Sequence, residues 1–177
     1  SAVNPHTNQV LPGGAEHRCN INAVMAAEIL VLYGDTPLLR PETLARMRSL
    51  KAETSADLVM LTAFGDTPGR IVRDSNGRIE RIVEAQDASP EELALEERNT
   101  GVYLFSSKLL WAGLGKIDHH NSQGEFYLTD VVGYAVESGH RVEALQVEDP
   151  EECLGINDRS QLAEATTATM EPSTTPH

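Results

Sequence analysis

The chain has 177 residues, a length that suits one domain with or without a tail, and 40% of them are hydrophobic, enough to bury a core. Its net charge of -13, from 27 acidic against 14 basic residues, argues against broad binding to nucleic acid or to a membrane surface, because both need a basic face. The sequence shows no signal peptide, no apolar run that could span a membrane and no CxxC pair, which favours a cytoplasmic protein.

The first half of the chain predicts two strands and a helix. The apolar run "ILVLY" (29–33) is typical of a short strand covered on both faces. The segment "PETLARMRSLKA" (41–52) opens with a proline and carries leucine and methionine at helical spacing, which predicts a helix. The apolar segment "ADLVMLTAF" (56–64) predicts a second buried strand.

The second half continues with a hairpin and then alternates helices with strands. The segment "RIVRDSNGRIERIVE" (70–84) predicts a hairpin, because Asn76-Gly77 favours a tight turn. A helix follows, and Ser89 and Glu92 form its capping box. The remaining elements are a strand over 101–105, an amphipathic helix over 126–139 closed by Gly139, a strand over 141–147 and a last helix over 158–165.

This order of elements predicts an α/β fold with a mostly parallel sheet, made mixed by the inserted hairpin. The folded domain is expected over residues 23–165. Residues 1–22 show no sustained periodicity, and residues 166–177 are rich in threonine and proline, which predicts a disordered tail.

A carboxylate stands where the first predicted strand ends. In open α/β sheets, ligands bind beyond the carboxyl ends of the strands, where Asp35 would emerge. Gly34 leaves room for a ligand near the backbone. An aspartate in this place suits Mg²⁺, which takes oxygen ligands from one or two protein groups and from substrate phosphates. From spacing alone, a turn residue or a helix cap explains Asp35 equally well.

Five segments, taken in chain order, resemble one enzyme family. The segments are "LVLYGDTPLL" (30–39), "GRIVRDSNGRIERIVEAQDASPEE" (69–92), "NTGVYLF" (99–105), "NSQGEFYLTDVV" (121–132) and "GINDRSQLAEA" (155–165). They are similar to parts of the bacterial bifunctional N-acetylglucosamine-1-phosphate uridylyltransferase and glucosamine-1-phosphate N-acetyltransferase. No single segment is decisive, but "QGEFYLTD" and "GINDR" narrow the match within the sugar nucleotidyltransferases.

The resemblance covers the middle and C-terminal part of the family's uridylyltransferase domain. It implies a Rossmann-like nucleotidyltransferase fold with helices on both faces of the sheet. It also implies a reaction in which UTP and N-acetylglucosamine 1-phosphate give UDP-N-acetylglucosamine, a cell-wall precursor, and pyrophosphate, with Mg²⁺ as cofactor. The family's Gly-rich phosphate loop and its first strand, its uracil-binding segment and its acetyltransferase repeats have no counterpart in this sequence. This chain alone is therefore expected to be weakly active or inactive.

The resemblance also implies a metal site. Asp35 would bind Mg²⁺ and would be the catalytic residue, and Asn157 would supply a second oxygen to the ion. Tyr33 and Gly34 would approach the nucleotide sugar beside Asp35. Judged by residue type alone, Asn157 is more often a helix cap and Tyr33 a core aromatic residue.

Three further residues are implied in sugar binding. Glu84 matches a glutamate that hydrogen-bonds the sugar, Asn99 an asparagine that contacts it, and Gly69 a glycine whose backbone approaches N-acetylglucosamine. Judged by residue type alone, Glu84 fits an exposed charge at a strand end. Asn99 fits a loop residue that hydrogen-bonds its own backbone, and Gly69 fits an ordinary turn glycine. The loop "GDTPGR" (65–70) is shorter than the family's and lacks its tyrosine, and Gln86 replaces a family lysine, so the match is weakest around Gly69.

Two alternatives to the uridylyltransferase stay open. One is a non-catalytic module that binds a sugar nucleotide or pairs with another chain, as a homo-oligomer for example. The other is a sugar-1-phosphate nucleotidyltransferase with a different base or sugar. Whether the enzyme is the uridylyltransferase or another nucleotidyltransferase, its expected partners are small-molecule substrates. Binding to nucleic acid or to a membrane is not expected.

Overall fold

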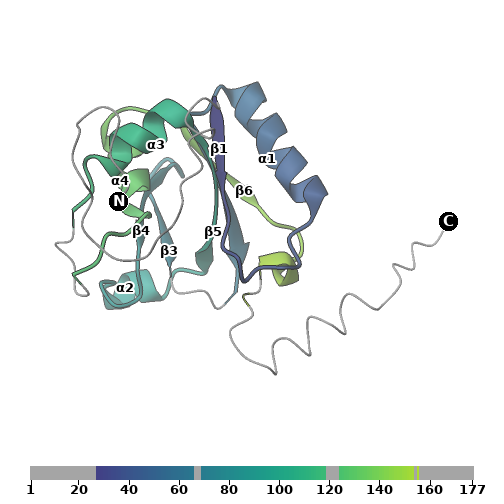
Figure 1. Cartoon of the computed structure of the whole chain (residues 1–177). Helices are drawn as coiled ribbons and strands as arrows, with labels where there is room; N and C mark the ends of the chain where they lie inside the picture. Colours follow the sequence, from purple (N-terminus) through teal and green to yellow (C-terminus); the bar gives the residue numbers. More distant parts are fainter. Residues whose placement is uncertain (1–26, 66–68, 119–123, 154, 156–177) are drawn as a thin grey trace.

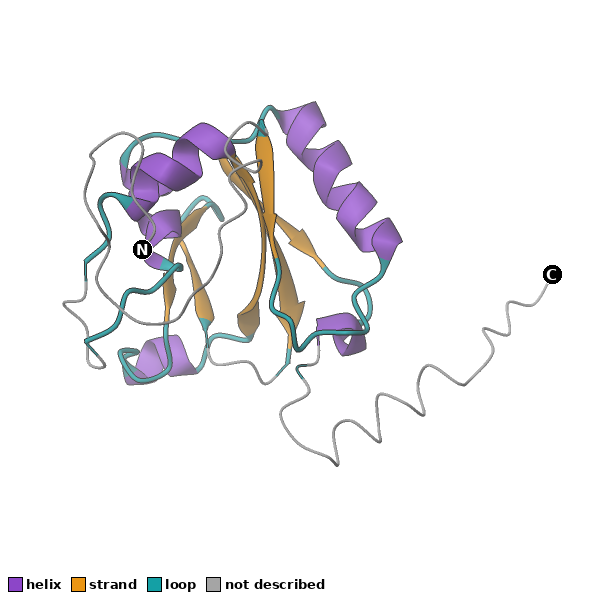
Figure 2. Cartoon of the chain, viewed as in Figure 1, coloured by secondary structure: helices purple, strands orange, loops and turns teal. Residues whose placement is uncertain are grey.

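The computed structural model of the chain describes residues 27–65, 69–118, 124–153 and 155. Within these residues, one six-stranded sheet is packed between helices (Figure 1, Figure 2). The strands are β1 (Glu28–Val31), β2 (Leu58–Phe64), β3 (Arg70–Arg73), β4 (Ile79–Val83), β5 (Glu97–Ser106) and β6 (Val142–Gln146). The helices are α1 (Pro41–Thr54), α2 (Pro90–Leu93), α3 (Ser107–Leu114), α4 (Asp130–Glu137) and the 3-10 helix η2 (Pro150–Cys153).

Strand β5 lies in the middle of the sheet and runs against its neighbours. β2 pairs antiparallel with one edge of β5 along nearly its whole length. The other edge is shared, since β1 pairs with residues 103–106 and β3 pairs at Arg98. β6 adds to β2 in parallel, and β4 adds to β3 in an antiparallel hairpin. Four strands, β1, β2, β3 and β6, therefore share one direction.

The predicted mixed α/β sheet with helices on both faces is confirmed, but its pairing is less parallel than the alternation of strands and helices indicated. Only β2 and β6 form a parallel pair among the described strands. The other described pairs are antiparallel because β5, which runs opposite to its neighbours, separates β1 and β3 from β2.

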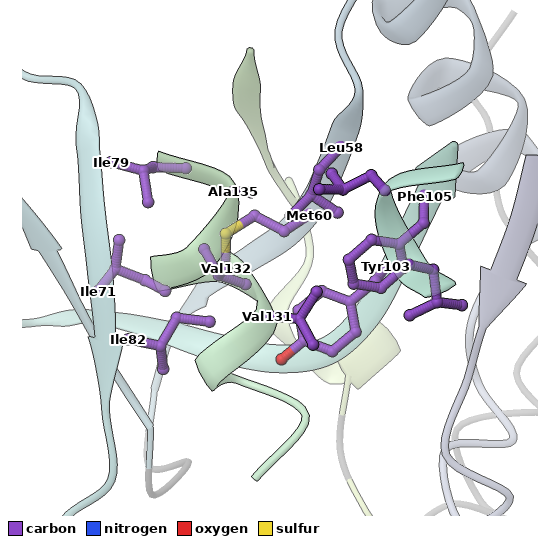
Figure 3. Packing of buried hydrophobic residues seen from close by; sticks show 12 residues of the cluster. Leu58, Met60, Ile71, Ile79, Ile82, Tyr103, Phe105, Val131, Val132 and Ala135 are labelled. Carbon is purple, nitrogen blue, oxygen red and sulfur yellow. The ribbon is translucent and has the colours of Figure 1, made fainter. Parts of the chain in front are cut away.

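Two hydrophobic clusters hold the layers together, one on each face of the sheet. In β2, alternate side chains point to opposite faces, so Leu58 and Met60 join one cluster while Val59 and Leu61 join the other. The first cluster includes buried residues of α3 and α4, and Figure 3 shows Tyr103 and Phe105 of β5 within it. The second cluster includes residues of α1 and η2. Figure 1 shows this arrangement, with α3 and α4 on one side of the sheet and α1 on the other.

The hairpin and the capping box form as the sequence predicts. Gly77 has φ +78° and donates its backbone N–H to the carbonyl of Asp74 at 3.0 Å, which closes the turn between β3 and β4. At the start of α2, the Ser89 side chain accepts from the backbone N–H of Glu92, and the Glu92 side chain accepts from the backbone N–H of Ser89. Both features depend on contacts within five residues, which a sequence pattern specifies well.

Several predicted boundaries are wrong. Helix α3 was not predicted, because it has only eight residues and follows β5 without a loop. Helix α4 begins at Asp130, four residues after the predicted start. The first strand is Glu28–Val31, and it is only partly covered, with Leu30 42% exposed, because it pairs with β5 alone among the described strands. The predicted helix over 158–165 lies outside the described residues.

A buried glutamate joins η2 to the start of α1. Glu152 is 4% exposed, and its Oε2 accepts a hydrogen bond from the Thr43 hydroxyl at 2.6 Å and from the backbone N–H of Arg40 at 3.2 Å. The Arg40 guanidinium also lies 2.7 Å from the carboxylate of Asp149. The chain that follows β6 is therefore attached to the chain that follows β1. We call these contacts the Glu152 clamp.

Candidate functional site

The register of three strands brings the predicted sugar-binding residues together. Arg70 pairs with Val83 in β4, so Gly69, just before β3, lies next to Glu84 at the end of β4. The backbone N–H of Asn99 donates to the carbonyl of Gly69 at 3.0 Å. Asn99 stands near the start of β5, and because β5 is antiparallel to β1 and β2, this is the edge at which those two strands end.

Gly69 is packed closely against Asn99. A Cβ atom at position 69 would lie 3.0 Å from the Asn99 Cβ and 3.4 Å from its Nδ2 and from Ile82. A larger residue would therefore push the asparagine from its place. The contact gives a physical reason for glycine at this position that the turn pattern alone does not supply.

The Asn99 side chain is fixed by two hydrogen bonds. Its Oδ1 accepts from the Tyr103 hydroxyl at 2.8 Å and from the backbone N–H of Gly101 at 3.1 Å. Asn99 is 8% exposed and lies inside β5, two residues into the strand, whereas the expected strand began only at residue 101. The side chain thus closes an Asx turn within the strand.

Tyr33 lies directly on Gly101. Gly101 has φ +78°, and a Cβ there would stand 1.8 Å from Cε2 of the Tyr33 ring. The β2–β5 register shifts at this point, between Met60 and Thr62, so the strand bulges around the glycine. Gly101 is a site residue that the sequence analysis missed. Its signal was the pattern "NTG", which predicts a turn but not a bulge inside a strand.

Asp35 follows Tyr33 in a turn that the Thr36 hydroxyl stabilises by donating to the Tyr33 carbonyl at 3.1 Å. Within the described residues, the Oδ1 atom of Asp35 is buried and accepts no hydrogen bond. Buried polar atoms are nearly always paired, so a carboxylate oxygen in this state calls for a partner of another kind. Gly34 beside it is exposed, and a Cβ atom placed on it would have no described atom within 4 Å.

Negative charge gathers around these residues. Burial raises the pKa of Tyr33, and the nearby charges of Glu84 and Asp35 raise it further. Burial also raises the pKa of Glu84, with Asp130 and Asp87 adding to the effect, while the hydrogen bond from Thr129 opposes it. A group of carboxylates that raise one another's pKa favours binding of a cation or of hydroxyl donors.

An open cavity of about 330 Å³ lies against Glu84. On its far side are residues of the loop before α4 and of α4 itself, including Thr129 and Asp130. Thr129 is 5% exposed, and its hydroxyl donates to Glu84 Oε1 at 3.2 Å, so it holds the carboxylate at the cavity wall. Thr129 belongs to the segment "NSQGEFYLTDVV" (121–132), and the sequence analysis assigned it no role.

The structure therefore brings five of the predicted site residues to one corner of the sheet. Tyr33 is coupled electrostatically to Asp35 and Glu84. Gly69 lies beside Glu84 in the β3–β4 register and is in contact with Asn99. Gly34 lies between two of them in the chain. Asn157, the second predicted metal ligand, lies outside the described residues. In the described part of the chain, no three His, Cys, Asp or Glu side chains stand close enough together to hold a metal ion, and none of the helices could cross a membrane.

Comparison with curated proteins finds proteins that are similar to this chain in sequence. The chain is 47% identical over 145 residues to the bifunctional protein GlmU of Solibacter usitatus, a match that covers 80% of this chain and 31% of that protein. It is 46% identical over 139 residues to GlmU of Bacillus cereus, covering 77% and 30% respectively. The chain resembles part of GlmU. It spans about a third of the length of the GlmU proteins it matches, and no protein-family model matches the sequence.

Solved structures show the same fold. A protein from Bacillus anthracis, described as a glucose-1-phosphate thymidylyltransferase in complex with sucrose, has a TM-score of 0.60 at 17% identity, over 88% of this chain and 59% of that one. A CMP:2-keto-3-deoxy-manno-octonic acid synthetase complexed with CTP has a TM-score of 0.58 at 14% identity, over 84% and 64%. The predicted nucleotidyltransferase fold and the predicted resemblance to the GlmU uridylyltransferase domain are both confirmed.

Proposed function

We propose that the chain supplies the sugar-binding and metal-binding part of a uridylyltransferase site. That site would convert UTP and N-acetylglucosamine 1-phosphate into UDP-N-acetylglucosamine and pyrophosphate. The observation that carries the proposal is the convergence of Tyr33, Asp35, Glu84 and Asn99 at one corner of the sheet. The similarity to GlmU proteins supports it, with the limit that the match covers about a third of their length.

The polar groups at this corner suit a hydroxylated sugar. Glu84 offers carboxylate oxygens that accept hydrogen bonds from sugar hydroxyls. Asn99 packs against Gly69, and the missing side chain of the glycine leaves the asparagine the space that it occupies. The Tyr33 ring is half exposed and rests on Gly101, so one of its faces is available to an apolar group of the ligand.

Asp35 suits Mg²⁺. Its buried Oδ1 without a hydrogen bond is a hard oxygen ligand, and the neighbouring negative charge of Glu84 favours a cation. Asn157 is proposed as the second protein ligand, through its amide oxygen. When bound, the ion neutralises charge on the substrate phosphates.

The chemistry asks the protein to position two substrates. In the proposed reaction, a phosphate oxygen of the sugar phosphate attacks the α-phosphorus of UTP in line, a new P–O bond forms, and the bond to pyrophosphate breaks. Such a step needs no covalent nucleophile from the protein, because positioning and electrostatics supply most of the rate increase. In this proposal Glu84, Asn99 and Tyr33 bind the sugar, and Asp35 binds the ion beside it; the electrostatic coupling of Tyr33 to Glu84 and Asp35 supports this division of roles.

Isothermal titration with UDP-N-acetylglucosamine, with and without Mg²⁺, tests the proposal. We expect binding that Mg²⁺ strengthens. In Asp35→Asn, which keeps the size of the side chain but removes its charge, the affinity measured with Mg²⁺ should fall to the metal-free value. Glu53→Gln, an exposed carboxylate on α1, is the matched control and should leave the Mg²⁺ effect intact. A full Mg²⁺ effect in Asp35→Asn would contradict the metal assignment.

Glu84→Gln should weaken sugar-nucleotide binding by about 1 to 3 kcal/mol, the usual cost of losing a charged hydrogen-bond partner. The same change should not lower the stability of the fold. The pKa of Glu84 is raised by burial, so the folded state holds the Glu84 proton more tightly than the unfolded chain does, and the ionised carboxylate costs stability at neutral pH. That cost disappears as the pH falls through the raised pKa, whereas sugar binding is lost over the same range.

Titration calorimetry and urea unfolding across pH measure both effects of Glu84→Gln. Glu80→Gln, on the outer face of the same strand, is the control and should change neither. Two results would contradict the proposed role of Glu84: a clear loss of stability in Glu84→Gln, or an unchanged affinity for the sugar nucleotide. Either would indicate that Glu84 is only a surface charge at the end of a strand. Titration with UDP-glucose in parallel distinguishes the proposed sugar from an alternative one.

A further inference from the structure

The orientation of the Asn99 amide is dictated by its surroundings. One atom of the amide lies 3.1 Å from the backbone N–H of Gly101. A backbone N–H can only donate, so the atom facing it must be the carbonyl oxygen and not the amide nitrogen. The Nδ2 atom is consequently on the side of Gly69, 3.4 Å from the position that a Cβ would take there.

A second donor strengthens this orientation from inside the core. The Tyr103 hydroxyl donates to the same Asn99 oxygen at 2.8 Å. Tyr103 is fully buried, and its ring is 5.6 Å from that of Phe105, tilted by 39°, in the cluster that β5 forms with α4 (Figure 3). Burial raises the pKa of Tyr103 strongly, so its hydroxyl stays protonated and remains a donor at any pH the fold tolerates.

We propose that Tyr103 is a positioning residue for the sugar site. Its hydroxyl holds the Asn99 carbonyl inward, so that the amide presents nitrogen, a hydrogen-bond donor, on the side of Gly69. A ligand is then recognised at Asn99 through an acceptor oxygen, while Glu84 recognises hydroxyl donors. This inference rests on the proposed function for the identity of the ligand, but the orientation of the amide does not.

Tyr103→Phe removes only the hydroxyl and keeps the ring in place. We expect it to weaken UDP-N-acetylglucosamine binding about 3- to 10-fold, the range for one neutral hydrogen bond. Tyr134→Phe, which removes a hydroxyl from α4 at the edge of the same cluster, is the matched control and should leave the affinity unchanged. Equal affinities of Tyr103→Phe and the wild type would overturn the proposal.

A double-mutant cycle separates positioning from a general structural effect. If Tyr103 acts through Asn99, the Tyr103→Phe change should cost nothing further in an Asn99→Ala background. A full additional loss in that background would show that Tyr103 acts by another route. Circular dichroism and urea unfolding show whether each variant is folded under the conditions of the titration.

Asn99→Asp tests the orientation without touching Tyr103. The aspartate keeps an oxygen for Tyr103 and Gly101 but replaces the nitrogen on the side of Gly69 by oxygen. We expect Asn99→Asp to bind the sugar nucleotide no better than Asn99→Ala. Tighter binding by Asn99→Asp would mean that the ligand uses the carbonyl, which contradicts the proposed orientation. If Tyr103→Phe does not fold, this comparison still tests the orientation of the amide on which the proposal depends.

Nuclear magnetic resonance of the ligand-free chain tests the positioning role of Tyr103 independently of the proposed function. The ¹⁵N relaxation of the Asn99 side-chain amide should indicate a rigid group in the wild type and in Tyr134→Phe, and a more mobile one in Tyr103→Phe. If the wild-type chain binds no sugar nucleotide but the amide responds in this way, the proposed function fails and the positioning role stands. If Tyr103→Phe leaves the amide equally rigid, the positioning role fails.

Discussion

Given UTP, N-acetylglucosamine 1-phosphate and Mg²⁺, this chain alone is expected to release pyrophosphate at a rate far below the range of about 1 to 1,000 per second that is typical of enzymes. Attack on a nucleoside triphosphate requires that its phosphates be held in line. Orientation of the reactants accounts for about 7 to 11 kcal/mol of barrier lowering, many decades in rate. In related folds, backbone N–H groups of a Gly-rich loop hold the phosphates, and no such loop occurs in this sequence.

Two arginines of β3 and β4 are already engaged with carboxylates. Arg81 lies 2.6 Å from the Glu92 carboxylate, and Arg73 lies 2.7 Å from Glu97. Both cations are therefore engaged in ion pairs on β3 and β4. A coupled pyrophosphate assay measures the rate, and titration of the same sample with UDP-N-acetylglucosamine shows whether the sugar half of the site is intact. Turnover within the typical range would mean that this chain builds a triphosphate site which its sequence pattern does not reveal.

Gly101→Ala should damage stability and binding together. The backbone at Gly101 has φ +78°, a conformation that costs other residues about 1 to 3 kcal/mol. The new methyl group would also occupy the place of the Tyr33 ring, since its carbon would lie 1.8 Å from Cε2. Tyr33 must therefore leave the bulge of β5, and the sugar site loses one wall. Urea unfolding and calorimetry should show both losses.

Gly133→Ala is the matched control for this change. Gly133 lies inside helix α4, and a Cβ added there would meet no described atom within 4 Å. Alanine is favoured over glycine within a helix by up to about 1 kcal/mol, so this variant should be as stable as the wild type or more stable. If Gly101→Ala were as well tolerated as Gly133→Ala, the contact between Tyr33 and Gly101 would have no part in shaping the site.

The sequence predicted features that depend on near neighbours in the chain. The turn at Gly77 and the capping box at Ser89 are specified within a few residues, and both form. The candidate site residues were found by resemblance to a family. The motifs that carry this resemblance lie at the ends of predicted strands, and they contain the same types of residue as the family motifs. Their convergence needed the structure, because β5 pairs with β1 and β3, and these segments lie far from it in the sequence.

The features that the sequence analysis did not predict also depend on contacts between residues that are not close neighbours in the chain. Nothing local indicates that Asn99 is held by Tyr103, four residues along the strand, because side chains at that spacing meet only where β5 bulges. The bulge depends on the pairing with β2. The antiparallel run of β5 between β1 and β2 is likewise a property of the whole sheet, and alternation of strands and helices favoured parallel pairing instead.

The Glu152 clamp has an entropic consequence for the proposed Mg²⁺ site. Arg40 and Glu152 are 112 positions apart in the chain, yet their direct contacts fix one close to the other. Asp35 lies five residues before Arg40, and Asn157 lies five residues after Glu152. Through the clamp, the two proposed ligands are joined by a path of about ten residues. Less chain then remains to be ordered when an ion binds between them, so the clamp lowers the entropy cost of binding the ion.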